Sequence, residues 1–501
     1  MNKAGGSVSD PVREQAERMG QPGESQSQQA LESLGYKQEL KRSVNSLGHV
    51  ALILSDITPT ASLLVVGTAV VATAGTGSVW AYIIGCFIAI NVALCMGELG
   101  SMFPVAGGLF SIVTRVLGKA TGFVAMVDYM GQAVFLPASV AIGIGTYVHS
   151  LDSSLPTNVI AGIGMIVVTG VALLQIRLNA WLTGVFLAIE LLVVGALAVA
   201  GFTHWQQSAS ILTHPVGPNG HGGLSPVAVS AIIAAIATAL FSVNGYDSGI
   251  NFAEEVLGKA SEVGRAVVIA ASLGIFFELI PFIAVVFGAH NLAAFVNSPT
   301  PMTEMAGQAF GHTFVTIITV GGLIAIFNAS VAITLQFSRI VWASGRDFAW
   351  PEPVSSWLAK VEHRRGAPWV ATLIVGALAT VLCFQATLVT VVTFTAVLIV
   401  ILYGLIAISA LVSRVRQRHL PRPSRMPLWP IPPILALAGV VIALTQQKHS
   451  DLVICACIFA ASLIYYFAFA RPRRDRYWTV PGALADPGEA PPPNPEATPG
   501  P

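Results

Sequence analysis

One short stretch in the middle of a long apolar run decides the fold, and it reads Leu54-Ser55-Asp56-Ile57-Thr58-Pro59-Thr60-Ala61-Ser62. A proline removes a backbone N–H donor and disfavours helix in the residue before it. Thr58 followed by Pro59 is also typical of an N-cap and a first-turn proline that begin a new helix. The stretch therefore predicts an unwound segment between two half-helices.

A second apolar run, near 226–253, is interrupted in the same way by Phe241-Ser242-Val243-Asn244-Gly245-Tyr246-Asp247. Asp247 is expected to cap a second half-helix. Irregular backbone at membrane depth is tolerated only where it is buried in protein or lines a cavity. Two interrupted runs in corresponding positions of two halves indicate a secondary transporter with inverted repeats. The alternative is a pair of ordinary Pro/Gly kinks in membrane helices.

The composition excludes a soluble domain. Hydrophobic residues make up 54% of the 501 residues and charged residues only 10%, whereas soluble domains carry about 25% charged residues. A surface covered by lipid explains this deficit. The net charge of +1 gives no reason to expect a nucleic-acid partner. We see no reactive cluster, metal-ligand motif or phosphate-binding loop, and we therefore expect no enzyme activity, no cofactor and no metal.

Twelve apolar runs approach the length of about 20 residues that a membrane-spanning helix needs. They lie near 48–74, 79–98, 121–148, 157–174, 179–202, 226–253, 266–289, 313–338, 368–385, 388–411, 428–446 and 452–470. With these spans, every Lys and Arg except Lys448 falls on the side of the two termini. Because cytoplasmic loops are rich in Lys and Arg, we expect a multi-pass protein of the cell (inner) membrane with both termini in the cytoplasm.

Further motifs follow in a fixed order along the chain. They are Glu98-Leu99-Gly100-Ser101, Phe103-Pro104-Val105-Ala106-Gly107-Gly108, the interruption at 241–247 with Ala253-Glu254-Glu255, and Gly345-Arg346-Asp347-Phe348-Ala349-Trp350-Pro351. From about residue 35 to 470 the sequence resembles the amino acid–polyamine–organocation superfamily of permeases. The resemblance implies an all-α, leucine-transporter-type fold of five helices, an inverted five and two extra helices.

The expected division of the chain follows from this resemblance. It comprises a cytoplasmic segment (1–46), two inverted repeats (47–205 and 206–415), helices 11 and 12 (416–470) and a disordered cytoplasmic tail (471–501). The resemblance also implies a substrate site in the two interruptions. Its candidate residues are Ser55, Asp56, Ile57, Thr58, Pro59, Thr60, Ala61, Ser62, Phe241, Ser242, Val243, Asn244, Gly245, Tyr246 and Asp247.

Five carboxylates lie inside spans that hold no Lys or Arg: Asp56, Asp128, Glu190, Asp247 and Glu278. A charge at the bilayer centre costs on the order of 3 kcal/mol or more. Each acid must therefore be protonated, hydrated, capped by backbone or paired with a bound cation. Glu190 is the leading candidate for a proton carrier, followed by Asp128 and Glu278. For each of them a permanently neutral structural acid is the alternative.

Glu254 and Glu255 follow the second interruption at the expected cytoplasmic mouth. They are candidates for a gate that pairs with Arg or Lys, and an ordinary solvated face is the alternative. In the interruptions themselves, the free N–H groups near Thr60 to Ser62 suit a carboxylate, and the free carbonyls near Phe241 to Val243 suit an ammonium.

Together these features predict a permease for amino acids that works by alternating access, with proton symport as the favoured coupling. The expected partners are a small amino acid or amine, a proton or other cation, and the lipid bilayer. A carrier of polyamines, choline-like cations or γ-amino acids, or an exchanger of the same fold, remains an alternative. A non-transporting membrane sensor is a further alternative from a different class.

Overall fold

The computed structural model describes residues 44–105, 107–174, 180–362 and 368–480. Most of the expected N-terminal segment and the tail after 480 lie outside this part. In the described residues helices dominate, and the one sheet is a short hairpin in which β1 (Val216–Pro218) pairs antiparallel with β2 (Leu224–Pro226).

Eight helical stretches are long and apolar enough to cross a membrane, and four shorter apolar helices accompany them. The first stretch, Ser46–Met102, holds two expected spans: the broken helix α3 (Ser46–Ile57), α4 (Pro59–Ala61), η1 (Ser62–Val66) and α5 (Gly67–Ala74), and then α6 (Ser78–Met102). The other long helices are α8 (Lys119–Leu151), α9 (Thr157–Leu174), α10 (Ala180–Thr203), α14 (Ala260–Gly288), α17 (His312–Arg346), α20 (Leu388–Arg416) and α22 (His449–Tyr465), the last prolonged by η4 and η5 to Arg473. The shorter ones are α7 (Gly108–Leu117), α12 (Val229–Ser242), α19 (Trp369–Gln385) and α21 (Ile431–Leu444).

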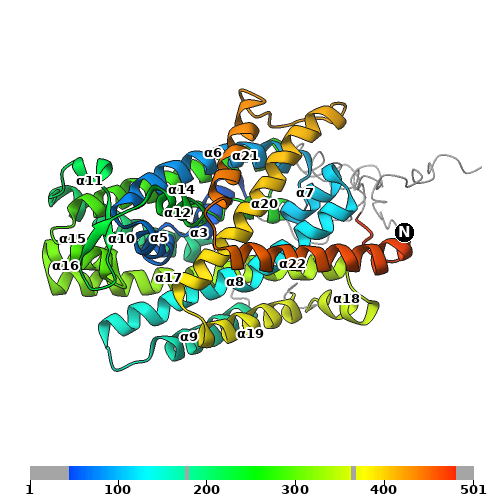
Figure 1. Cartoon of the computed structure of the whole chain (residues 1–501). Helices are drawn as coiled ribbons and strands as arrows, with labels where there is room; N and C mark the ends of the chain where they lie inside the picture. The colour runs from blue at the N-terminus through cyan, green and yellow to red at the C-terminus, as the bar shows by residue number, and fades with distance from the viewer. Residues whose placement is uncertain (1–43, 106, 175–179, 363–367, 481–501) are drawn as a thin grey trace, which may run out of the picture.

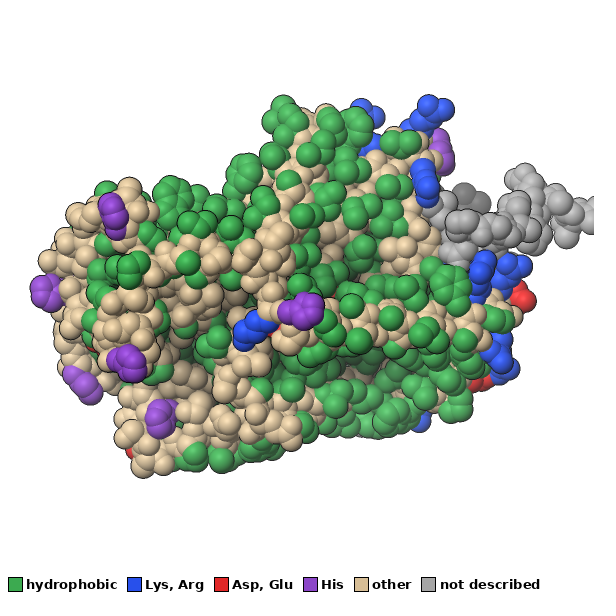
Figure 2. Space-filling view, viewed as in Figure 1, with side chains coloured by type: hydrophobic (Ala, Val, Ile, Leu, Met, Phe, Trp, Pro, Cys, Tyr) green, Lys and Arg blue, Asp and Glu red, His purple; other side chains and the backbone are tan. Residues whose placement is uncertain are grey.

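The helices bundle side by side, and small elements cover the two ends (Figure 1). One end carries α11 (Ser210–Thr213), α15 (Leu292–Asn297) and α16 (Pro301–Phe310), and the other carries α7 and α18 (Glu352–Leu358). Figure 2 shows most of the visible Lys and Arg side chains towards the α7 and α18 end, with most visible His side chains at the opposite end. Large apolar side chains such as Leu192 (73% exposed) and Ile317 (62%) point outward, as is expected of a surface in contact with lipid.

The helix contacts bring the two breaks together. α6 packs against α12 and α14, α3 packs against α14, and α8 packs against α9, α17 and α20. At the crossing of α6 and α14, a Cβ on Gly97 would lie 2.8 Å from the Gly264 carbonyl oxygen. Small residues let membrane helices approach this closely.

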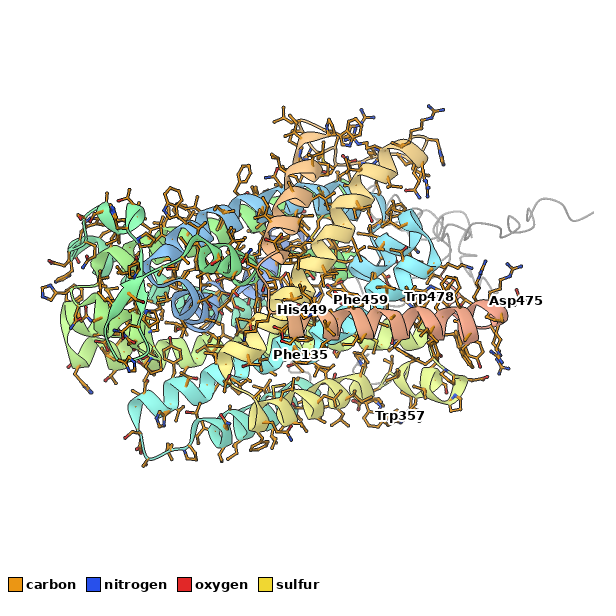
Figure 3. The ribbon with its side chains drawn as sticks, viewed as in Figure 1. Phe135, Trp357, His449, Phe459, Asp475 and Trp478 are labelled. Carbon is orange, nitrogen blue, oxygen red and sulfur yellow. The ribbon has the colours of Figure 1, made fainter. Side chains whose placement is uncertain are left out.

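The start of the tail packs against the body, although the sequence suggested disorder from Arg471 onward. The Trp478 side chain is 1% exposed and its Nε1 donates to the Lys119 carbonyl oxygen at 3.0 Å. The backbone N–H groups of Trp478 and Thr479 donate to the carbonyl oxygens of Phe348 and Asp347. In Figure 3, Trp478 lies near the end of α22, and Phe459 and Phe135 lie where α22 runs beside α8. The expectation of disorder is therefore wrong for residues 471–480.

Candidate functional site

The first break is confined to one residue. Thr58 is in the left-handed region (φ 49°, ψ 66°), where it ends α3 and begins α4, with Pro59 as the first helical residue. Its side chain makes no capping hydrogen bond. Ser62 compensates, because its hydroxyl donates to the Ile57 carbonyl oxygen at 2.9 Å. The Ser62 N–H is not free as expected, since it donates to the Thr58 carbonyl oxygen.

The second break is longer. α12 ends at Ser242, five non-helical residues follow, and the helix that resumes, α13 (Ser248–Asn251), has only four residues. Asp247 precedes α13 but its side chain makes no capping bond. Instead, one carboxylate oxygen accepts a hydrogen bond from the Tyr129 hydroxyl of α8. The Phe241 carbonyl oxygen accepts from the Asn244 N–H, so this carbonyl is also engaged.

The two breaks touch each other at Gly245. Its φ of +113° lies in a region that L side chains rarely adopt. A Cβ at this position would lie 2.8 Å from the Asp56 carbonyl oxygen and 2.8 Å from the Ile57 backbone. Only glycine meets both requirements. The two interruptions that the sequence predicted are thus in direct backbone contact, at Gly245 of the second and Asp56–Ile57 of the first.

A small pocket opens at this contact. Its wall comes from the first broken helix, α8, the second break and α17. The lining residues are Asp56, Ile57, Thr58, Ser62, Val66, Leu136, Val140, Phe241, Asn244, Gly245, Ile333 and Gln336. Of the predicted site residues, seven therefore line the pocket: Asp56, Ile57, Thr58, Ser62, Phe241, Asn244 and Gly245. Ser55, Pro59, Thr60, Ala61, Ser242, Val243, Tyr246 and Asp247 are buried around it without being part of the lining.

Three of the predicted carboxylates sit in separate polar contacts. Glu190 of α10 is fully buried, and Asn328 of α17 donates to its Oε1 at 3.3 Å. The Thr60 hydroxyl, two residues after the first break, donates to the Glu190 backbone carbonyl at 2.6 Å. Glu190 is thus the carboxylate that adjoins the first broken helix from outside the pocket.

Glu278 and Asp128 are bonded elsewhere. Ser242, the last residue of α12, donates to Glu278 Oε2 at 2.6 Å and also bonds the Tyr82 hydroxyl of α6. Asp128 accepts from Gln132 at 3.0 Å within α8 and is 1% exposed. For the described residues, no group of three or more His, Cys, Asp or Glu could hold a metal ion.

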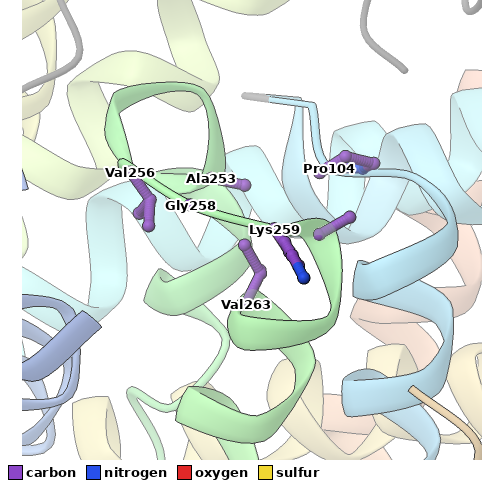
Figure 4. Close-up of a pocket in the computed structure, with 7 residues that line it drawn as sticks. Pro104, Ala253, Val256, Gly258, Lys259 and Val263 are labelled. Atoms are coloured by element: carbon purple, nitrogen blue, oxygen red, sulfur yellow. The ribbon is translucent and has the colours of Figure 1, made fainter. Parts of the chain in front are cut away.

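The segment after α13 carries the predicted gate residues. Glu255 forms an ion pair with Arg339 of α17 (Nη2–Oε1, 3.3 Å), and the Arg339 guanidinium lies 4.8 Å from the centroid of the Phe252 ring. Glu254 is buried. Val44 makes a parallel bridge here, donating to the Glu255 carbonyl and accepting from the Leu257 N–H. Figure 4 shows a separate hollow beside this segment, between Pro104 and Val263, away from the breaks.

Several polar residues with partners near the breaks or elsewhere in the bundle were not predicted from the sequence. Gln336 lines the pocket. Tyr403 of α20 donates to Asn244 Oδ1 at 2.5 Å, and Asn251 of α13 donates to the Tyr129 hydroxyl at 2.9 Å. Glu98, cited only as part of a motif, is buried between Arg414 (2.5 Å) and Arg422 (2.8 Å). A polar residue within an apolar run was the one available signal for Gln336.

Known proteins are similar in sequence to this chain over most of its length. A family described as "Amino acid permease" matches residues 45–471. An uncharacterized transporter of Mycobacterium tuberculosis is 24% identical over 85% of this chain and 91% of its own. A branched-chain amino acid permease of Bacillus subtilis is 22% identical over 87% of this chain and 94% of its own. A serine/threonine exchanger of the same organism is 22% identical over 85% of this chain and 97% of its own. These relatives are transporters, not enzymes. With a family match that runs from the first broken helix through α22, the chain belongs to the amino acid permease family.

Proposed function

We propose that this protein is a secondary active amino acid transporter that works by alternating access, driven by proton symport. The observation that carries the proposal is the contact of the two breaks at Gly245, beside a pocket that holds Asp56. Non-helical backbone at membrane depth is tolerated only where it is buried in protein or lines a cavity, and here it does line one. The related permease and exchanger carry amino acids by their names.

The helix contacts support twelve spans arranged as two inverted repeats (47–205 and 206–415), followed by two extra helices (416–470). The contact of α3 with α14 has a counterpart in α12 with α6, and that of α10 with α14 has one in α20 with α6. Likewise, α8 with α20 corresponds to α17 with α10. Such reciprocal contacts are expected of a pseudo-two-fold arrangement. The gathering of Lys and Arg at the α7 end supports cytoplasmic termini in a cell membrane.

The charge balance of the pocket supports a proton as the coupling ion. An amino acid zwitterion beside an ionised Asp56 gives a net charge of minus one, and the described lining contains no Lys or Arg. Arg339 of α17 already pairs with Glu255. A proton taken up with the substrate on a second buried carboxylate lowers the negative charge of the bundle, in a medium where an uncompensated charge is expensive.

Glu190 is the proposed proton carrier. Its backbone carbonyl is bonded to Thr60 at the start of the half-helix after the first break, and its carboxyl is bonded to Asn328 of α17. Protonation of Glu190 would change the hydrogen bonding of its carboxyl group with Asn328, at the point where α10 contacts both α17 and the first broken helix. Asp128 and Glu278 remain secondary candidates, and Glu255 with Arg339 is the proposed cytoplasmic gate.

The test is uptake of labelled amino acids by proteoliposomes that contain the purified full-length chain. We expect accumulation to rise when the outside is made more acidic than the lumen. Glu190→Gln should lose accumulation driven by the pH gradient and keep exchange of internal for external substrate. Glu304→Gln in α16, which changes the same residue type far along the chain from the breaks, should keep both. No accumulation of any amino acid would refute the transport proposal, and gradient-driven uptake by Glu190→Gln would refute the proton role.

A further inference from the structure

The pocket lining contains two buried polar atoms without a hydrogen-bond partner. One is Asp56 Oδ2, and the other is Gln336 Nε2. Their side chains belong to residues that are 6% and 2% exposed. A carboxylate oxygen accepts and an amide nitrogen donates. Buried polar groups are normally paired, so these two atoms indicate a ligand that brings one donor and one acceptor.

Most of the remaining lining is aliphatic or aromatic. Val66 comes from the first broken helix, Leu136 and Val140 from α8, Phe241 from α12 and Ile333 from α17. These side chains come from four elements. Among the described lining residues, Asp56 is the charged one. The polar lining residues Asn244 and Ser62 already make hydrogen bonds, to Tyr403 and to the Ile57 carbonyl oxygen. The pocket therefore combines an anionic group and an unpaired amide N–H with a wall suited to a hydrocarbon group.

From this combination we infer that the pocket takes a neutral amino acid with an aliphatic side chain when it widens from the volume of about 20 Å³ that it has in this conformation. The ammonium group pairs with Asp56, the carboxylate accepts from the Gln336 amide, and the side chain lies against Val66, Val140 and Ile333. The inference rests on the proposed transport function and goes further by naming the substrate class. It also gives Gln336 a binding role.

Charged side chains fit this wall poorly. A lysine side chain would bring a second ammonium among Val66, Leu136 and Val140, where the described lining offers no second carboxylate. A glutamate side chain would meet Asp56 and no base. Burying an unpaired charge is far more costly than adding or removing a methylene. Selection against charge is thus expected to be strong, and selection among aliphatic side chains weak.

Norleucine and lysine provide a matched pair, since they share a four-carbon chain and differ in the terminal ammonium. In proteoliposomes of the full-length chain, we expect leucine and norleucine to accumulate with kcat/KM at least about 100-fold above that of lysine or glutamate. Isoamylamine, which lacks the carboxylate, and 4-methylpentanoate, which lacks the amine, should each compete with leucine about 100-fold less well than norleucine does.

Variants then assign the two headgroup contacts. Asp56→Asn should reduce the preference for leucine over 4-methylpentanoate at least tenfold, and Gln336→Leu should reduce the preference over isoamylamine by a similar factor. Asp128→Asn and Gln132→Leu change a buried pair of the same residue types in α8 that is not part of the lining. These controls should leave both preferences unchanged, whatever they do to the rate. A loss of folding is recognised by size-exclusion chromatography, and the wild-type ratios test the substrate class independently.

The outcomes separate the two proposals. Uptake of lysine or glutamate in preference to leucine overturns the substrate class and leaves amino acid transport standing. Unchanged ligand preferences in Asp56→Asn and Gln336→Leu overturn the headgroup assignment. If none of the amino acids accumulates, the transport function itself fails.

Discussion

The two broken helices differ in how the interrupted backbone is stabilised. In the first, a single left-handed residue, Thr58, separates α3 from a helix that continues through α4, the π-helical turn η1 and α5. The Ser62 hydroxyl satisfies the Ile57 carbonyl across the break. In the second, five non-helical residues precede a helix of only four. Side chains from α8 and α20 hold this second break through Tyr129 and Tyr403. A side chain of the same helix therefore bridges the first break, whereas the side chains that bond the second break come from other helices.

The largest effect is expected at the point where the breaks meet. Gly245→Ala adds a Cβ that would lie 2.8 Å from the Ile57 backbone, at a φ of +113°. We expect uptake to fall about 100-fold, because a displacement of about 1 Å at a site can cost that much. Gly220→Ala is the control: it has a φ of +79° with no neighbouring atom within 4 Å. Equal losses in both variants would show that strain alone, rather than the contact, matters.

Removing the proline tests the local nature of the first break. Pro59→Ala restores an N–H donor and lets Thr58 adopt helical geometry. We expect a higher melting temperature in detergent and uptake about tenfold slower, since the break loses its main cause. Pro281→Ala, inside the unbroken α14, should raise the melting temperature without this loss. If Pro59→Ala transports normally, the first break does not depend on its proline.

Removing one tyrosine hydroxyl near each break compares how much each break depends on side chains of neighbouring helices. Tyr129→Phe removes the hydroxyl that serves Asp247 and Asn251, and we expect kcat/KM to fall about five- to tenfold. Tyr147→Phe removes a hydroxyl that donates to the Leu64 carbonyl oxygen in the first broken helix. That carbonyl also accepts from Thr68, so the change should be about twofold or less. The reverse order of effects in uptake kinetics would contradict the contrast between the breaks.

The smallest effect is expected at the ion pair of Glu255 and Arg339. The side chains of Arg339 and Glu255 are 25% and 19% exposed, and pairs that reach solvent contribute about 0–1 kcal/mol. Glu255→Gln should therefore change uptake less than about fivefold. Exchanging the two charges, with Glu255→Arg and Arg339→Glu combined, should recover most of the change. If the exchanged pair takes up substrate more slowly than either single variant, Glu255→Arg or Arg339→Glu, attraction between the two charges is not what the pair contributes.

The positions of both breaks could be predicted from the sequence because proline, glycine and acidic residues mark them within apolar runs. The family resemblance was confirmed by the family match over residues 45–471. Each expected span also overlaps a described helix, although α12 is shorter than the run suggested. The four-residue α13, which packs against α3, α7 and α14, was not foreseen.

The polar partners of the site could not be predicted. Gln336, Tyr129 and Tyr403 lie on three different helices, and only packing brings them to the breaks. The same holds for Glu98, which is joined to Arg414 and Arg422 more than 300 positions later. A single sequence shows which side chains are polar, but the partner across the bundle depends on how the helices cross.

The bridge at Val44 links the two broken helices in another way. Two backbone hydrogen bonds join the residue just ahead of α3 to the chain just after α13. Because backbone groups make these bonds, most substitutions at either partner leave them intact, and only a proline in place of Val44 or Leu257 removes a donor. The chain can therefore accumulate many changes around residues 255–257 while the two broken helices stay joined.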